Sequence, residues 1–290
     1  MLQGPQSGWG HPLVIGLLGG AAVLMAAFVV IERRHHRPML DLSLFRYPRF
    51  VGVQLLAAAP AYAFVVLLIL LPIRFIGIGG LSAAAGGQMM MALSAPLLVL
   101  PLVAGWLTHR FTPATICGSG LLLSAAGLFW LSRIPVEAGP AAAILPMLVI
   151  GTGISFPWGL MDGLAVSVVP KERAGMATGI FSTTRVAGEG VALAIVTAAL
   201  SALTHVHLGQ GAGAMDAAQR LVTGDAGGAE IAAGLGHAAV VTAYSHAFQS
   251  LLLGLTGITL LTAAVVFLFL GRQAHEDPAG EVAQTCDASE

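Results

Sequence analysis

The chain has 290 residues, of which 57% are hydrophobic and only 9% are charged, and its mean hydropathy is +0.86. About a quarter of the residues of a soluble domain are charged, and a water-soluble core of this size needs far more polar surface. The composition therefore indicates an integral membrane protein and excludes an ordinary soluble enzyme, a nucleic-acid-binding protein and a disordered chain. The net charge of −1 provides no large basic surface, and the two cysteines provide no disulfide framework.

Seven apolar segments are long enough to cross a membrane, since a helix needs about 20 apolar residues to cross about 30 Å of hydrocarbon. Their unbroken length excludes membrane strands, which are short and alternate in polarity. The fold class expected is an all-α integral membrane protein with about seven transmembrane helices. The segments are about His11–Ile31, Phe50–Ile73, Ala83–Leu107, Pro113–Leu131, Ala141–Val169, Ala174–Leu203 and Ala243–Leu270.

The basic residues predict the orientation, because cytoplasmic loops carry the excess of Lys and Arg. Nine of the thirteen fall in one set of connections, three fall in the other, and Arg185 lies inside the sixth segment. We therefore expect the N-terminus outside the cell membrane and the C-terminus in the cytoplasm. The nine are Arg33, Arg34, Arg37, Arg46, Arg49, Arg110, Lys171, Arg173 and Arg272, and the three are Arg74, Arg133 and Arg220.

Three regions are expected along the chain. Residues 1–49 comprise an external N-terminus, a linker helix and an amphipathic cytoplasmic linker, and residues 50–271 form a six-helix bundle. Residues 272–290 form a polar cytoplasmic tail. Within the bundle, residues 204–242 are rich in Gly and Ala and are expected to be a poorly ordered external connector.

Three ionisable side chains lie well inside the apolar segments, where charges are costly and usually face a cavity or each other. Glu189 lies near the middle of the sixth segment, and Arg185 lies four residues away on the same helical face. This pair is either an internal ion pair or a proton or cation-substrate site at Glu189 that Arg185 tunes. Asp162 either pairs locally or belongs to the inner cavity. Arg74 is expected to extend from its helix end to the membrane surface.

Small residues, prolines and aromatic residues are placed where membrane helices pack closely or are interrupted. The pairs Gly159–Gly163 and Gly175–Gly179 have a spacing that lets helices approach each other. Prolines interrupt helices and often mark transport sites. The prolines are Pro60, Pro96, Pro101 and Pro157, and the candidates for lining a cavity are Tyr62, Phe156, Pro157 and Trp158, with ordinary packing as the alternative.

Five strings of residues resemble those of one known family. Residues 37–46 read RPMLDLSLFR and resemble a P-L-L-D-L-x-L-F linker. Residues 71–86 contain LPIRFIG and GLSAAAG, which resemble P-L-Y-L-Q followed by G-x-S-x-x-x-A-G. Residues 105–112 read GWLTHRFT and resemble the cytoplasmic loop G-x-L-x-D-R-x-G. Residues 151–157 read GTGISFP and resemble G-x-G-x-x-F-P, and residues 169–179 read VPKERAGMATG and resemble V-P-x-E-x-R-G-x-A-S-G.

These strings occur in the order found in the major facilitator superfamily, in its branch of 14-helix drug:proton antiporters. The resemblance covers about Pro12 to Leu270 and matches only the second half of such a transporter, a linker helix plus the last six helices. The loop residues Gly105, His109 and Arg110 are implied to latch neighbouring helices, although His109 replaces an acid of the family's motif and the residue at 112, a threonine, replaces its last glycine.

The resemblance implies export of drug-like amphipathic compounds in exchange for protons, by alternating access between two bundles. The chain is therefore expected to be inactive without the missing N-terminal half. The partners implied are the lipid bilayer, that half-transporter, small amphipathic molecules and protons, while a periplasmic adaptor stays open. The alternatives are a non-functional truncated remnant and a non-transport seven-helix membrane receptor.

Other functions lack the residues that they need. A retinal protein needs a buried lysine, and the only lysine, Lys171, lies in a predicted cytoplasmic loop. An enzyme is not expected, because HExxH, GxSG and CxxC motifs are absent and the GSG at 118–120 lacks the required spacing. No cofactor and no metal site is expected, since His205 and His207 have no third ligand near them in the sequence.

Overall fold

The computed structural model describes residues 12–34, 48–134, 138–167, 169, 174–209, 211 and 213–270. These residues form helices and no strand. Six helical spans among them are long and apolar enough to cross a membrane. The helix α2 (Pro12–Arg34) adds a shorter apolar stretch over residues 15–27. The chain is thus an all-α multi-pass membrane protein, with six spans and one shorter apolar helix where the sequence predicted about seven spans.

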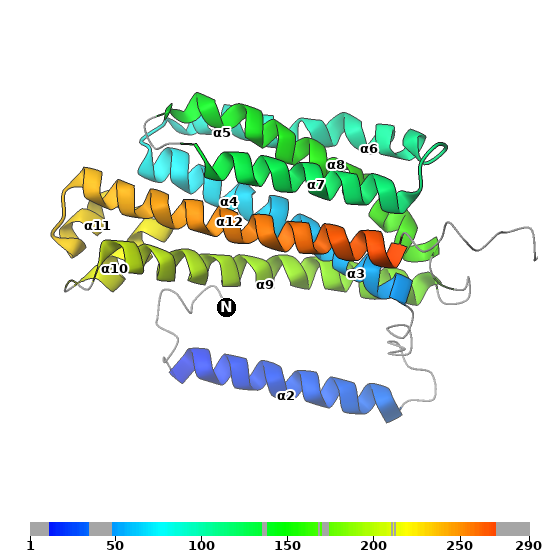
Figure 1. The fold of residues 1–290 in the computed structure, drawn as a ribbon. Helices are drawn as coiled ribbons and strands as arrows, with labels where there is room; N and C mark the ends of the chain where they lie inside the picture. The colour runs from blue at the N-terminus through cyan, green and yellow to red at the C-terminus, as the bar shows by residue number, and fades with distance from the viewer. Residues whose placement is uncertain are drawn as a thin grey trace, which may run out of the picture.

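The spans form one elongated bundle, and α2 lies outside it (Figure 1). The first span comprises α3 (Pro48–Pro60), the π-helix η2 (Ala61–Val65), α4 (Val66–Pro72) and the π-helix η3 (Ile73–Ile78), and the second comprises α5 (Ala83–Ser94) and α6 (Pro96–Leu107). The other four spans are α7 (Pro113–Ser132), the 3-10 turn η5 (Pro140–Ala143) together with α8 (Ile144–Ser167), α9 (Ala174–Leu208) and α12 (His237–Leu270). Two short helices, α10 (Ala214–Val222) and α11 (Ala226–Ala233), connect α9 to α12.

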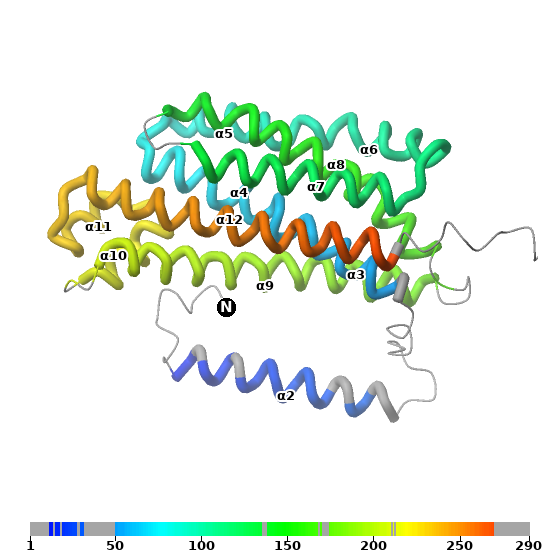
Figure 2. Tube along the Cα trace, in the orientation of Figure 1, coloured from blue at the N-terminus to red at the C-terminus, as the bar shows by residue number. Residues whose placement is uncertain are grey.

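The buried core lies where the first span, α7, α8 and α12 meet. Of the most apolar stretch of each span, 61% is buried in the first span and in α7, compared with 11% in α5–α6 and 17% in α9. The two least buried spans lie along opposite edges of the bundle (Figure 2). The side chains of α2 that the structure describes are all exposed. The inner helices are therefore covered by protein, and the outer ones present apolar faces to their surroundings.

Prolines explain why the first span is irregular. Pro60 and Pro72 each end an α-helical stretch, and a π-helical stretch follows each of them. A proline inside a helix has no N–H to donate to the preceding turn, and its ring crowds the carbonyl there. A wider turn relieves this crowding, and such turns change which residues face the neighbouring helices. The sequence correctly placed an interruption at Pro60.

The helices α7 and α8 approach each other so closely that glycine is required at the contact. A Cβ atom added at Gly153 would lie 2.5 Å from the carbonyl oxygen of Gly120 and closer still to the backbone nitrogen of Ser124. Real Cβ atoms do not approach other atoms this closely, so the two backbones touch directly. Between membrane helices, such van der Waals contact at small residues is a main source of association.

The predicted small-residue pairs are only partly used. A Cβ atom at Gly159 would lie 2.8 Å from the Cα atom of Pro101, so α8 also meets α6 closely. Added Cβ atoms at Gly163, Gly175 and Gly179 would meet nothing within 4 Å. The interpretation of these three as close-packing positions within this chain was wrong, because spacing shows which residues share a helical face but not which face meets another helix.

The predicted poorly ordered connector at 204–242 contains two helices instead. In α10, buried residues recur with helical spacing at Ala214, Ala217, Ala218, Leu221 and Val222. This is the pattern of a helix with one face packed on a core. The expectation failed because alanine makes such a face look like a low-complexity linker.

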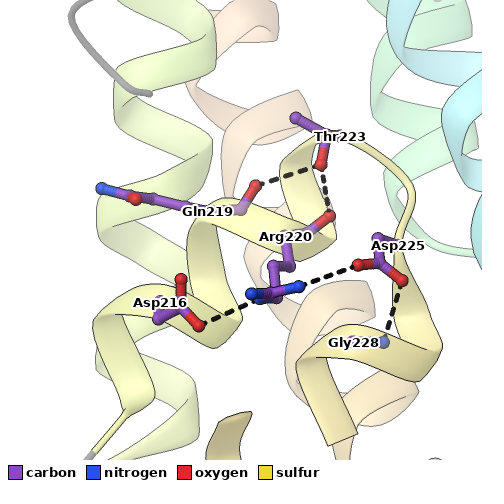
Figure 3. Close-up of polar contacts among 6 residues, drawn as sticks. All are labelled: Asp216, Gln219, Arg220, Thr223, Asp225 and Gly228. Atoms are coloured by element: carbon purple, nitrogen blue, oxygen red, sulfur yellow. Dashed lines mark hydrogen bonds and ion pairs between the residues drawn. The ribbon is translucent and has the colours of Figure 1, made fainter. Parts of the chain in front are cut away.

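A small polar network fixes the turn between α10 and α11 (Figure 3). Arg220 Nε donates to Asp216 Oδ2 at 2.9 Å, and Arg220 Nη1 donates to Asp225 Oδ2 at 3.2 Å. The other oxygen of Asp225 accepts from the backbone N–H of Gly228 at 2.8 Å and caps α11. The hydrogen bond to Asp216 raises the pKa of Arg220 above its ordinary value.

This turn docks on the first span. Gly224, with φ +88°, lies in the turn, and a Cβ atom added at Gly77 in η3 would lie 2.7 Å from its Cα atom. Glycine at 224 adopts this left-handed backbone without strain, and glycine at 77 leaves room for the close approach. The α10–α11 connection therefore lies directly against the end of the first span at these two glycines.

The first prediction concerns the contact between α7 and α8. Gly153→Ala is expected to lower the free energy of unfolding by about 1–3 kcal/mol, because a methyl group there would force the two helices apart. Gly163→Ala on the same helix, where the Cβ atom meets open space, is the matched control and should not lose stability. Thermal unfolding of the purified protein in detergent, followed by circular dichroism, measures both. Equal midpoints for the two variants would contradict the contact.

The second prediction concerns the docked connection. Gly77→Ala is expected to loosen the α10–α11 turn from η3, so that the backbone around the exposed Arg220 opens more often and trypsin cleaves there about 5–30-fold faster. Gly87→Ala in α5, where an added Cβ atom meets nothing within 4 Å, serves as the control and should be cleaved at the wild-type rate. The measurement is a time course of limited proteolysis. Unchanged cleavage in Gly77→Ala would show that the connection is not held by this contact.

Candidate functional site

Two of the three charged residues predicted inside the spans form an ion pair between helices. Arg185 Nη1 on α9 donates to Asp162 Oδ1 on α8 at 3.4 Å. The guanidinium also lies 5.8 Å from the ring centroid of Phe181, one turn back on α9. The side chain of Asp162 is 68% exposed and that of Arg185 is 27% exposed. Where water reaches a pair this open, it contributes at most about 1 kcal/mol.

Glu189 stands apart from this ion pair. The helix α9 has 35 residues and its midpoint is residue 191, so Glu189 lies close to the middle of the span. Its side chain is half-buried, and among the described residues no ion pair joins it to Arg185. The i,i+4 spacing allowed such a pair, but the guanidinium turns to Asp162 on the neighbouring helix. Within the described part of the chain, this carboxylate therefore has no countercharge in a membrane-spanning helix, where charge is costly.

The predicted latch loop joins α6 to α7 and lies on the surface. Thr112, where the family's motif has glycine, caps α7 by accepting from the backbone N–H of Thr115 at 3.3 Å. This capping role explains the departure from the motif. Gly105, His109 and Arg110 are exposed, and neither of the two side chains forms an ion pair within the described part of the chain. Their latching role stays a prediction.

Two predicted cavity residues link the first span to other helices. Tyr62 on η2 donates its hydroxyl proton to Thr262 Oγ1 on α12 at 2.5 Å. Trp158 on α8 contacts Phe64 on η2 edge to face, with ring centroids 5.8 Å apart. Both aromatic residues therefore converge on the π-helical stretch that follows Pro60.

The other two predicted cavity residues contact α7. A Cβ atom added at Gly120 would lie 2.9 Å from Pro157 Cδ and 3.0 Å from Phe156 Cβ. Pro157 is buried. The backbone and Cβ region of these two residues are thus part of the close α7–α8 contact, and a role in lining a cavity stays a prediction for all four.

Several polar side-chain atoms are buried without a hydrogen-bond partner among the described residues, and of their residues the sequence analysis had singled out Arg74 alone. They are both amide atoms of Gln54, Nη1 of Arg74, and the hydroxyls of Ser124 and Tyr244. A buried unsatisfied polar group costs about 1–3 kcal/mol, so each of these atoms needs an explanation. The sequence could have identified Gln54 as a candidate, because it is the one amide side chain in the apolar segment 50–73.

Arg74 corrects one prediction. It was expected to extend to the membrane surface, but its Nη1 atom is buried and its guanidinium lies 4.7 Å from the ring centroid of Phe248 on α12. The expectation failed because the side chain contacts the ring of Phe248 and lines a cavity of the bundle instead. Such a ring position stabilises a desolvated cation by about 2 kcal/mol.

The orientation prediction rests mainly on residues that lie outside the described part of the chain. These include the linker residues 37–46, residues 170–173 and the tail 272–290, and the side chains of Arg33, Arg34 and Arg49. The placement of the two ends relative to the membrane therefore stays a prediction.

The chain is similar in sequence to known membrane transport proteins. The sequence pattern of the Major Facilitator Superfamily matches residues 6–193. Multidrug resistance protein Stp of Mycobacterium tuberculosis is 31% identical over 204 residues, which are 70% of this chain and 37% of the relative. The tetracenomycin C resistance and export protein of Streptomyces glaucescens is 26% identical, over 68% of this chain and 36% of the relative. The puromycin resistance protein pur8 of Streptomyces alboniger is 24% identical, over 97% and 52%.

The chain spans between about a third and a half of the length of these relatives. The matched pattern covers the first three spans and α8 completely, and it reaches beyond the Arg185–Asp162 pair into α9. It also includes the latch loop and the glycines of the α7–α8 contact. The chain therefore belongs to the Major Facilitator Superfamily.

Proposed function

We propose that this chain is the C-terminal half of a proton-coupled exporter of amphipathic, drug-like compounds. The names of three relatives, which refer to multidrug resistance, tetracenomycin C resistance and export, and puromycin resistance, support this substrate class. The proposed place is the inner or plasma membrane, with the N-terminus outside and the C-terminus in the cytoplasm. The observation that carries the proposal is the half-buried carboxylate of Glu189 in the middle of α9.

Glu189 is suited to carry a proton because Arg185 is engaged elsewhere. The Arg185 guanidinium pairs with Asp162, so protonation of Glu189 breaks no ion pair within the described residues. Protonation also removes the cost of holding a charge within the membrane. Exposure of the carboxyl group to water on either side favours release of the proton and return of the negative charge. A group with these two states couples proton movement to a change in which side of the membrane the site faces.

The face of α9 that the bundle leaves open fits the missing half. Gly175, Gly179 and Gly190 are exposed or open to space, with nothing within 4 Å of an added Cβ atom, and Ala187 is exposed on the same helix. Small residues let a second helix approach closely, whereas a face covered only by lipid needs no such residues. The spacing of Gly175 and Gly179 thus serves, in this proposal, contact with the N-terminal bundle.

The third prediction tests whether the chain acts alone. Residues 1–290 expressed in bacteria that lack their own efflux pumps are expected to export no ethidium, because one bundle cannot alternate access around a central site. Export that a protonophore abolishes is expected once the N-terminal bundle is supplied, either from the reading frame upstream or as the first half of the Stp relative. The measurement is intracellular ethidium fluorescence. Protonophore-sensitive export by residues 1–290 alone would contradict the proposal.

The fourth prediction concerns the proton carrier. In the completed transporter, Glu189→Gln is expected to reduce proton-driven ethidium export to the level of cells without the protein, because the amide cannot take up or release a proton. Glu230→Gln is the matched control, since Glu230 lies on α11 and pairs with His237 at the start of α12. Full export by Glu189→Gln would remove this residue from the mechanism.

A further inference from the structure

A cavity lies at the end of the bundle where η3, the end of α7, η5 and the start of α12 meet. Its volume is about 190 Å³. The walls are mostly apolar and include Leu71, Phe75 and Leu131. Among the described residues that line it, only Arg74 and Ser245 have polar side chains. The cavity is therefore an apolar space with one positive charge in its wall.

The guanidinium of Arg74 has unused hydrogen-bonding capacity. Its Nη1 atom is buried and has no partner among the described residues, and one face of the group is covered by the ring of Phe248. The hydroxyl of Tyr244, one turn earlier on α12 than Phe248, is also buried without a partner among the described residues. A guanidinium carries five N–H donors in a planar fork. At least one of these donors is desolvated and has no acceptor among the described residues.

No carboxylate of the described residues forms an ion pair with Arg74. The ion pairs among the described residues involve Arg185, Arg220 and His237 instead. A cation that is removed from water needs an anion to offset its desolvation, because aromatic contact alone covers only part of the cost. The acid nearest to this cavity in the sequence, Glu137, lies outside the described residues.

We propose that this cavity binds a small apolar carboxylate, with its carboxylate on Arg74 and its apolar body against Leu71, Phe75 and Leu131. A guanidinium matches a carboxylate in shape and charge. A cavity of about 150 Å³ in another protein holds benzene, so this one has room for a single ring. Apolar walls and a single cation do not compensate the stronger hydration of a phosphate group. The site lies at the opposite end of α8 from Asp162 and does not depend on the proposed transport function.

The experiment titrates benzoate into the purified chain in detergent by isothermal calorimetry, with neutral benzamide as the matched ligand. Benzoate is expected to bind at least about tenfold more tightly than benzamide, because only benzoate fills the charged donors. Arg74→Gln is expected to weaken benzoate binding about tenfold or more. Arg133→Gln is the matched control, since Arg133 also lies over a ring, at 5.0 Å from Phe129, but is exposed and outside the cavity.

Several outcomes would overturn the proposal. They are no benzoate binding, equal affinity for benzoate and benzamide, or equal effects of Arg74→Gln and Arg133→Gln. The comparison of the two ligands uses the wild-type chain and therefore holds even if Arg74→Gln does not fold. Glu137→Gln should leave benzoate affinity unchanged. A tenfold gain in that variant would show that the chain's own carboxylate occupies Arg74, which also overturns the proposal.

Discussion

Backbone contact between α7 and α8 sets the arrangement of the bundle, because lipid gives apolar helix faces no hydrophobic reason to associate. Gly120 and Gly153 let these two helices touch, and Gly159 also brings α8 close to α6. Farther along, Asp162 joins α8 to Arg185 on α9. The helix α8 is therefore the element from which the neighbouring spans take their positions, and a side chain added at one contact would move several helices together.

Glu189, the proposed proton carrier, lies on α9, and α9 contacts α8 through the Arg185–Asp162 ion pair. The position of Glu189 in the bundle therefore depends on how α8 is packed. The helix α9 is one of the two least buried spans, and it carries Glu189 together with open small residues such as Gly179 and Gly190. If a second bundle docks on that face, Glu189 lies where the two bundles meet. In the proposed transport cycle, rocking of one bundle against the other would change the access of water at that boundary, which is where the proposal needs its proton carrier.

The sequence predicted the spans well, because about 20 consecutive apolar residues are a strong signal that neighbouring contacts do not override. It missed α10 because the repeat at Ala214, Ala217 and Leu221 is built largely of alanine. It offered Glu189 as a partner for Arg185 because spacing along one helix reveals only partners on that helix. The partner found, Asp162, depends on how α8 and α9 are rotated against each other. For the same reason, the spacing of glycines showed which of them lie on one face of a helix but not which faces contact a neighbouring helix.

The two π-helical stretches of the first span place polar side chains against α12. Pro60 and Pro72 each cost a regular backbone hydrogen bond, and the π-helical turns after them shift the direction of the side chains that follow. The side chains so placed include Tyr62, which hydrogen-bonds to α12, and Arg74, which lies against a ring of α12. A regular helix would turn these residues differently, so the two interruptions and the two contacts with α12 depend on each other. Polar groups thus enter the interior of the bundle at the points where the helix is interrupted.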